Sequence, residues 1–266
     1  MSLGIVIKGP EGIVLAADSR LTLTAQTPQG PIHVNYDNAT KLLSFNKPHN
    51  YVSVVTYGQA AIGLRTASSY LPEFENTLKE ERLPVKAFAE RLSTFFLEQW
   101  RKEMPGDYKG PNMTFVVGGF SEGDAYGQVF LFEIPGSPEP RRQYDSGFGI
   151  TWGGQREIVD RLMQGFDGRI IQILTQKLNL QEEDTQKLHN LLKQELQLPV
   201  PIQAMALQDC VDLSVFFLRT TMWAQNLTIG IRGVGGAIDV ATITRREGFR
   251  FIQKKEIVAE RSNTNV

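Results

Sequence analysis

Cysteine and long apolar runs are scarce in this sequence, and each scarcity excludes a class of protein. The 266 residues include one cysteine, Cys210, so no disulfide can form within the chain, which is typical of a reducing compartment. No apolar run approaches the roughly 18 residues that a membrane span requires. No basic stretch followed by an apolar one opens the chain as a secretory signal would. The sequence therefore predicts a soluble, cytoplasmic protein with no membrane partner.

Excess charge of one sign and metal-binding patterns are also missing. Lys and Arg number 28 and Asp and Glu number 29, and this balance gives no support for a basic face that would bind nucleic acid. The three histidines, His33, His49 and His189, lack the spacing of metal ligands and do not pair by pattern with a nucleophile. We therefore expect neither nucleic acid nor a metal as a partner, and no cofactor.

Two motifs that look catalytic predict ordinary turns instead. Residues 119–123 read GFSEG and match the G-x-S-x-G pattern of a nucleophilic serine, which requires a strand followed by a helix. A second strand-like run follows at 126–134, so we predict a hairpin loop. The glycines from Gly230 to Gly236 precede the strand-like run AIDVATIT rather than a helix, which argues against phosphate binding.

Strand-like and helix-like segments occur in blocks along the chain. The β-rich runs lie within 1–58, where a polar, turn-rich excursion over 22–38 interrupts them, and again within 112–134 and 237–256. Helical patterns cover 59–81, 84–104, 154–166, 178–198 and 202–225. Two strand blocks that enclose paired long helices, without a linker or a repeat, predict one α+β domain spanning 1–266. We expect a four-layer αββα sandwich.

The first twenty residues, MSLGIVIKGPEGIVLAADSR, read as a strand, a Gly-Pro turn and a second strand that ends in Asp18-Ser19-Arg20. This opening resembles the proteasome-type N-terminal-nucleophile hydrolases, specifically their β-type subunits. Weaker matches follow at NATKLLSF, VVTYGQAA, TWGGQREIVDRL and GGAIDVATIT, so the resemblance covers most of the chain. Extra residues lie before Lys41 and in a helical segment at about 176–200.

The resemblance implies four catalytic positions. Counting back from Asp18 places the family's first residue, normally a threonine nucleophile, at Ser2, which removal of Met1 would expose. Lys41 and Asp18 occupy the places of the family's paired lysine and aspartate. Gly58, expected to open the first long helix, stands where the family has its oxyanion-hole glycine.

These residue types suit the chemistry. A hydroxyl becomes a good nucleophile only when a base takes its proton, and the α-amine of a first residue can serve, with an ordinary pKa of about 7.7–8.0. A buried ammonium favours the neutral amine and the developing anion, and a carboxylate must pair with that ammonium. A backbone N–H can then stabilise the tetrahedral oxyanion, a contribution of roughly 2.7–4 kcal/mol.

The chain departs from the family pattern at two supporting positions. Where the family has a serine between glycines before its third helix, this chain reads Gly153-Gly154-Gln155. Where the family has an aspartate and a serine before its last strands, this chain reads AQNLTIGIRGVGG. Gln225 or Asn226 falls near the aspartate position and Thr228 near the serine position.

The resemblance further implies a peptide or unfolded-protein substrate, extended beside Leu21-Thr22 and beside the segment from Thr56 to Ala60. Two alternatives stay open: a catalytically silent, ring-forming structural subunit, and an N-terminal-nucleophile amidase that acts on small molecules. A closed homo-oligomeric ring and a regulatory ATPase are the implied partners.

Aromatic residues lie on more than one face of the helical patterns 84–104 and 211–223. We expect a leftover apolar strip on each as an association site. The alternative is that the extra segment at 176–200 covers both strips within the same chain.

Overall fold

The computed structural model describes residues 2–78, 80–145 and 147–259, apart from the side chains of residues 24–26 and 31. These residues form two five-stranded sheets, in which neighbouring strands are antiparallel. The first sheet contains, in spatial order, β12 (Gly149–Gly154), β1 (Leu3–Lys8), β2 (Ile13–Asp18), β13 (Ile238–Thr244) and β14 (Gly248–Gln253). The second contains β11 (Ser137–Gln143), β10 (Gln128–Ile134), β9 (Met113–Gly119), β6 (Val52–Gly58) and β5 (Leu42–Ser44).

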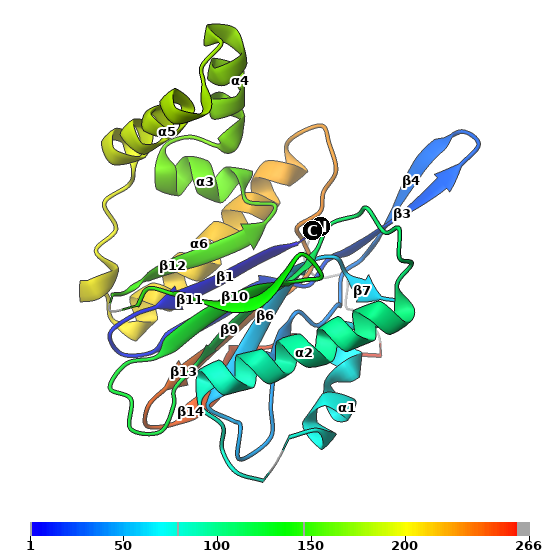
Figure 1. Ribbon diagram of the computed structural model, residues 1–266, viewed down its shortest axis with the longest axis vertical. Helices are drawn as coiled ribbons and strands as arrows, with labels where there is room; N and C mark the ends of the chain where they lie inside the picture. Colours follow the sequence, from blue (N-terminus) through cyan, green and yellow to red (C-terminus); the bar gives the residue numbers. More distant parts are fainter. Residues whose placement is uncertain (1, 79, 146, 260–266) are drawn as a thin grey trace.

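The two sheets pack against each other across an apolar core (Figure 1). Every residue of β1 and β2 is buried, because both faces of these central strands are covered. The core between the sheets includes Val6, Leu15, Val55, Val116 and Ala241. Ser2, which immediately precedes β1, is buried as well.

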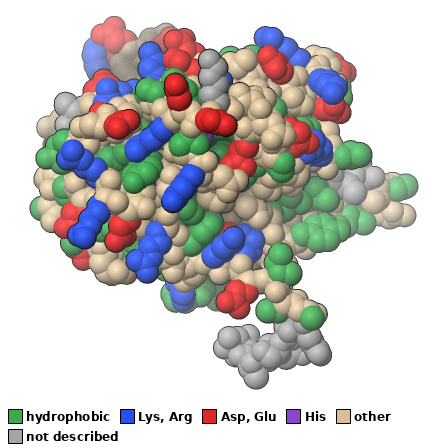
Figure 2. Space-filling view, turned by 90° about the horizontal axis from the view of Figure 1, so that it is seen from below, with side chains coloured by type: hydrophobic (Ala, Val, Ile, Leu, Met, Phe, Trp, Pro, Cys, Tyr) green, Lys and Arg blue, Asp and Glu red, His purple; other side chains and the backbone are tan. Residues whose placement is uncertain are grey.

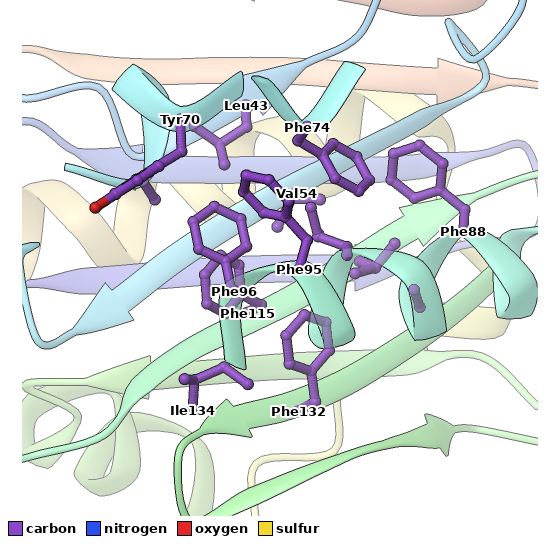
Figure 3. Packing of buried hydrophobic residues seen from close by; sticks show 14 of the residues in the cluster. Leu43, Val54, Tyr70, Phe74, Phe88, Phe95, Phe96, Phe115, Phe132 and Ile134 are labelled. Atoms are coloured by element: carbon purple, nitrogen blue, oxygen red, sulfur yellow. The ribbon is translucent and has the colours of Figure 1, made fainter. Parts of the chain in front are cut away.

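Helix α2 (Val85–Glu103) covers the outer face of the second sheet, together with α1 (Leu71–Asn76). Figure 3 shows aromatic rings of both helices and of the sheet in one cluster, in which Phe96 lies 4.6 Å from Phe115 between ring centroids. The aromatic residues of α2 are all buried: Phe88, Phe95, Phe96 and Trp100. The expectation of a leftover apolar strip on this helix is wrong, because the sheet and α1 together surround it.

Helix α6 (Leu207–Asn226) covers the outer face of the first sheet, beside α3 (Glu157–Gln164). It buries Phe217 completely but leaves Phe216 51% and Trp223 62% exposed. The prediction of an α+β fold is confirmed, with helices on the outer face of each of two packed sheets.

The extra helical segment differs in extent from the expected 176–200. It consists of α4 (Gly168–Leu178) and α5 (Glu182–Leu196), which pack on each other and beside α3, followed by the short η2 (Ile202–Ala204). All residues of α4 and α5 are described, and none is buried. Figure 1 shows both helices projecting from the body, so they do not cover the exposed aromatic residues of α6.

The helix expected over 59–81 is largely absent. Strand β6 ends at Gly58 and is followed by β7 (Ala61–Ile62), β8 (Arg65–Thr66), η1 (Ala67–Tyr70) and only then α1. A tight turn at Gly63, whose φ is +58°, separates β7 from β8, and Pro72 lies in the first turn of α1. Gly58 therefore ends a strand rather than opening the first long helix, and that expectation is wrong.

The excursion over 22–38 is an ordered hairpin of β3 (Leu21–Thr27) and β4 (Gly30–Tyr36), which projects from the body in Figure 1. Its cross-strand pairs include Leu21 with Tyr36 and Leu23 with Val34, an alternation typical of strands. Strand β11, SPEPRRQ, was also missed, because its two prolines and its charges disfavour a strand and only pairing with β10 fixes it. Among the described residues, no helix has the length and apolarity needed to cross a bilayer.

Candidate active site

Ser2 lies immediately before β1, which runs between β12 and β2 in the first sheet. The residue is 6% exposed. Its carbonyl oxygen accepts a hydrogen bond of 2.7 Å from the backbone N–H of Gln155, just beyond the end of β12. The pairing of β1 with two neighbours thus fixes the backbone of Ser2 on the side of β12.

Asp18 ends β2 and has a fully buried carboxylate with four hydrogen bonds. Its Oδ1 accepts from the Leu3 N–H at 2.9 Å and from the Lys41 ammonium at 2.7 Å. Its Oδ2 accepts from the Arg20 N–H at 3.1 Å and from the Gly235 N–H at 3.0 Å. Because every donor points at a charged acceptor, the burial of this carboxylate is compensated.

Lys41 precedes β5 and is buried with its ammonium between Asp18 and the backbone of Arg20. Burial lowers the pKa of the Lys41 ammonium, and the neighbouring Asp18 carboxylate opposes this shift. Asp18 also accepts the N–H of Leu3, the residue after Ser2, so a hydrogen bond connects the Asp18–Lys41 pair to the backbone next to Ser2. The three polar residues predicted from the sequence come together here.

A small cavity of about 20 Å³, room for roughly one water molecule, opens beside these residues. Its lining residues come from the N-terminus, from the segments before β3 and β5, and from β6 to η1: Ser2, Arg20, Leu21, Ala39, Thr40, Lys41, Thr56, Tyr57, Gln59, Ala60, Thr66 and Ala67. Two of the three residues expected to contact substrate, Thr56 and Ala60, are among them.

The remaining expected residues lie near this cavity without lining it. Thr22 is on the β3–β4 hairpin, where its hydroxyl donates to Asn35 at 2.8 Å. Gly58 ends β6 with a φ of +89°, and a Cβ there would approach the carbonyl oxygen of Asn112 to 2.2 Å. Glycine is therefore required at this position by the backbone itself, whatever its part in an oxyanion hole.

Tyr57 is one of the residues that line the cavity. A Cβ on Gly153 would lie 2.3 Å from its ring and one on Gly4 would lie 2.8 Å away, so both glycines allow close packing on this ring. Burial raises the pKa of the Tyr57 phenol above its ordinary value. Gly153, which lies where the chain departs from the family pattern, is thus required for close packing on Tyr57.

The three residues considered for the supporting positions differ in their surroundings in the structure. Gln225 donates through Nε2 to the side-chain Oε1 of Gln155 and accepts the N–H of Val234 at 2.9 Å. Asn226 and Thr228 are exposed, and the Thr228 hydroxyl donates to the carbonyl of Ala224. No signal in a single sequence marks Gln155 and Gln225 as partners, because 70 residues separate them.

The two turn predictions are confirmed. Residues 120–127 form the loop between β9 and β10, in which the Ser121 hydroxyl accepts the N–H of Val85 at the start of α2. The segment from Gly230 to Gly236 leads into β13, and the N–H of Gly235 donates a hydrogen bond to Asp18. The described residues contain no group of three His, Cys, Asp or Glu that could hold a metal ion.

The two packed sheets with helices on their outer faces define the protein as an α+β fold. No family model matches the chain, and no curated protein matches it. Solved structures do match. A Gly-1 mutant of Anbu from Hyphomicrobium sp. strain MC1 aligns at 16% identity over 98% of this chain and 89% of that chain, with a TM-score of 0.57. The Anbu complex from Pseudomonas aeruginosa, in a helical assembly, aligns at 14% identity over 96% and 88%, also with a TM-score of 0.57.

These structures correct the family predicted from the sequence. The assignment to proteasome β-type subunits is wrong, because the similar structures are Anbu proteins and no family model or curated protein supports it. The prediction rested on the Asp-Ser-Arg strand end and a few short matches, which are too few residues to identify a family. What remains is a similarity of fold to the Anbu structures.

Proposed function

We propose that the chain is a hydrolase of amide bonds, built as a four-layer αββα sandwich, with Ser2 as its N-terminal nucleophile. The observation that carries this proposal is the buried ion pair of Lys41 and Asp18, at 2.7 Å, whose lysine lines the same cavity as Ser2.

The mechanism uses the chain's own terminus as the base. After removal of Met1, which lies outside the described residues, the α-amine of Ser2 takes the proton of its own hydroxyl as the oxygen attacks the substrate carbonyl. The Lys41 ammonium favours the neutral amine and stabilises the oxygen anion, and Asp18 holds Lys41 in place. The N–H of Gly58 is our candidate oxyanion donor. The amine then returns the proton to the leaving group, and water hydrolyses the acyl-enzyme.

We propose a peptide as the substrate, extended between the segment at Leu21-Thr22 and the segment from Thr56 to Ala60. Leu21, Thr56 and Ala60 line the cavity, and both segments are strands or strand ends that can pair with an extended backbone. The cavity has room for roughly one water molecule, so it does not by itself define a side-chain preference.

The same small cavity favours one alternative, a catalytically silent structural subunit. Intact-mass measurement of the native protein separates the two functions, since a retained Met1 leaves no free Ser2 amine. A panel of fluorogenic peptides and small amides separates a peptidase from a small-molecule amidase.

The decisive experiment compares Ser2→Ala with Ser2→Thr. We expect Ser2→Ala to abolish hydrolysis while the circular dichroism spectrum stays unchanged, since a hydroxyl adds little to the fold at a chain terminus. Ser2→Thr retains the nucleophile and should keep measurable turnover. Activity of Ser2→Ala close to that of the wild type would place the active site elsewhere.

We also propose that the chain forms a homo-oligomer. Phe216 and Trp223 stay exposed on α6, and the hairpin over residues 21–36 exposes four large apolar side chains but contains no Asp, Glu, Lys or Arg. Figure 2 shows this hairpin as a projection with apolar and uncharged polar side chains. Exposed apolar surface of this kind marks association sites. The Anbu complex forms a helical assembly; a closed ring and a regulatory ATPase stay predictions for this chain.

A further inference from the structure

The C-terminal turn of α6 reaches two backbone segments that meet at the proposed site. Gln225 lies one residue before the end of the helix, and its side-chain amide is partly buried between Gln155 and Val234. Gln155 follows β12, and Val234 belongs to the loop before β13. A single side chain therefore connects loops that are far apart in the sequence.

The direction of each hydrogen bond in this connection follows from the backbone. The N–H of Val234 can only donate, so the Gln225 atom 2.9 Å from it is the oxygen, Oε1. The Gln225 nitrogen, Nε2, must then face Gln155 and donate to its Oε1. One orientation of the two side-chain amides satisfies both hydrogen bonds. We call these two hydrogen bonds, which join Gln155, Gln225 and Val234, the bridge.

Each end of the bridge continues directly to a proposed catalytic residue. On one side the backbone N–H of Gln155 donates to the carbonyl oxygen of Ser2 at 2.7 Å. On the other side Gly235, which follows Val234, donates its N–H to Asp18 Oδ2 at 3.0 Å and accepts the N–H of Ser19 at 3.1 Å. The bridge thus spans from the backbone of the nucleophile to the carboxylate that holds Lys41.

The backbone of Gly154 approaches the carbonyl of Ser2 closely. Gly154 has a φ of +94°, and a Cβ there would lie 2.0 Å from the Ser2 carbonyl oxygen. The Gly154-Gln155 segment therefore follows the Ser2 backbone closely, and a shift of Gln155 moves Ser2 relative to Lys41. Small misplacements of a nucleophile lower the rate of the chemical step much more than they lower substrate binding.

We propose that Gln225 is a positioning residue, which through Gln155 and the Val234-Gly235 backbone fixes the position of Ser2 relative to the Asp18–Lys41 pair. This inference rests on the proposed function. In this chain two neutral glutamines, Gln155 and Gln225, would support the site, whereas the family pattern has an aspartate and a serine at its supporting positions.

The test compares variants of the bridge on one fluorogenic peptide. Gln225→Met keeps the length of the side chain but removes its polar atoms, and we expect kcat to fall about tenfold with KM within about twofold. Gln225→Glu still accepts the Val234 N–H, and Gln155 can rotate its amide to donate to it, so kcat should stay within about threefold of the wild type. Asn226→Ala, an exposed neighbour outside the bridge, is the control and should match the wild type.

The same network predicts that the two glutamines act as one unit. Gln155→Met should lower kcat as much as Gln225→Met, and the double variant should be no slower than either single one. Wild-type kcat in Gln225→Met, or multiplicative losses in the double variant, would overturn the proposal. A Gln225→Glu variant as slow as Gln225→Met would also overturn it.

Hydrogen exchange separates failure of the bridge from failure of the proposed function. In Gln225→Met, the amides of Gln155 and Gly235 should exchange at least tenfold faster than in Asn226→Ala, whereas amides of β9 should not change. Unchanged exchange contradicts the bridge, whether or not the protein is active. If the wild-type protein shows no hydrolysis, or hydrolysis that Ser2→Ala retains, the proposed function is contradicted instead. That result is obtained before any variant of Gln225 is assayed.

Discussion

At the scale of single residues, the site combines groups whose protonation states depend on each other. Lys41 is buried against Asp18, and burial lowers the pKa of its ammonium from the ordinary value of 10.5. Tyr57, which lines the same cavity, has its pKa raised and so stays protonated throughout the range in which Lys41 titrates. Lys41 is therefore the group in the cavity whose titration should limit activity at alkaline pH.

We expect a bell-shaped dependence of kcat/KM on pH. Activity rises as the Ser2 α-amine loses its proton, with a midpoint below its free value of about 7.7–8.0, because the nearby ammonium favours the neutral amine. It falls as Lys41 loses its own proton, and since the pKa of Lys41 is lowered, this midpoint lies below 10.5. Rates measured from pH 5 to 11, with the Ser2→Ala background subtracted, check both limbs. A plateau that extends beyond pH 10.5 would contradict the role of Lys41.

At the scale of elements, packing decides which faces of the helices stay exposed. Both α2 and α6 carry aromatic residues around their circumference, and sequence alone predicts a leftover strip on each. On α2 the strip is absent, since Phe74 of α1 and Tyr70 of η1 cover the side that the sheet does not reach. On α6 nothing in the described part of the chain covers Phe216 or Trp223, which remain exposed.

This difference in burial predicts that the same Phe→Ala substitution changes the free energy of unfolding strongly on α2 and little on α6. Phe96→Ala removes a fully buried ring from the cluster shown in Figure 3 and should lower the free energy of unfolding by about 3–5 kcal/mol. Phe216→Ala removes a half-exposed ring and should change it by at most about 0.5 kcal/mol. Urea unfolding at low protein concentration measures both. Similar losses in the two variants would show that the assignment of their environments is wrong.

At the scale of the whole molecule, the exposed apolar surface of α6 and of the β3–β4 hairpin predicts self-association. Light scattering at micromolar concentration should report a mass several times that of the 29.8 kDa chain. Trp223→Asp places a charge on this surface and should shift the population towards the monomer, since an unpaired charge is costly in an interface core. Tyr126→Asp, an exposed aromatic position on the loop between β9 and β10, is the matched control. A wild-type monomer of about 30 kDa would refute the prediction.

The sequence by itself determined the features that depend on neighbouring residues. The strands around Val6 and Leu15, the hairpin of β9 and β10, and the α+β class follow from apolar periodicity and turn residues, which act over a few positions. The sequence also singled out Ser2, Asp18 and Lys41, which lie close together in the structure, while their catalytic roles stay a prediction. They meet in the structure because β1 and β2 are adjacent antiparallel strands and the segment before β5 passes the end of β2.

Only the tertiary structure decided what depends on contacts between distant segments. Strand β11 exists because β10 offers it a partner, although its own residues disfavour a strand. Gly58 ends β6, where backbone from the start of β9 approaches it, instead of beginning a helix. The Gln155–Gln225 bridge joins residues 70 positions apart. The family prediction was wrong because it rested on a few residues, whereas the similarity to the Anbu structures is one of fold, over 98% and 96% of this chain.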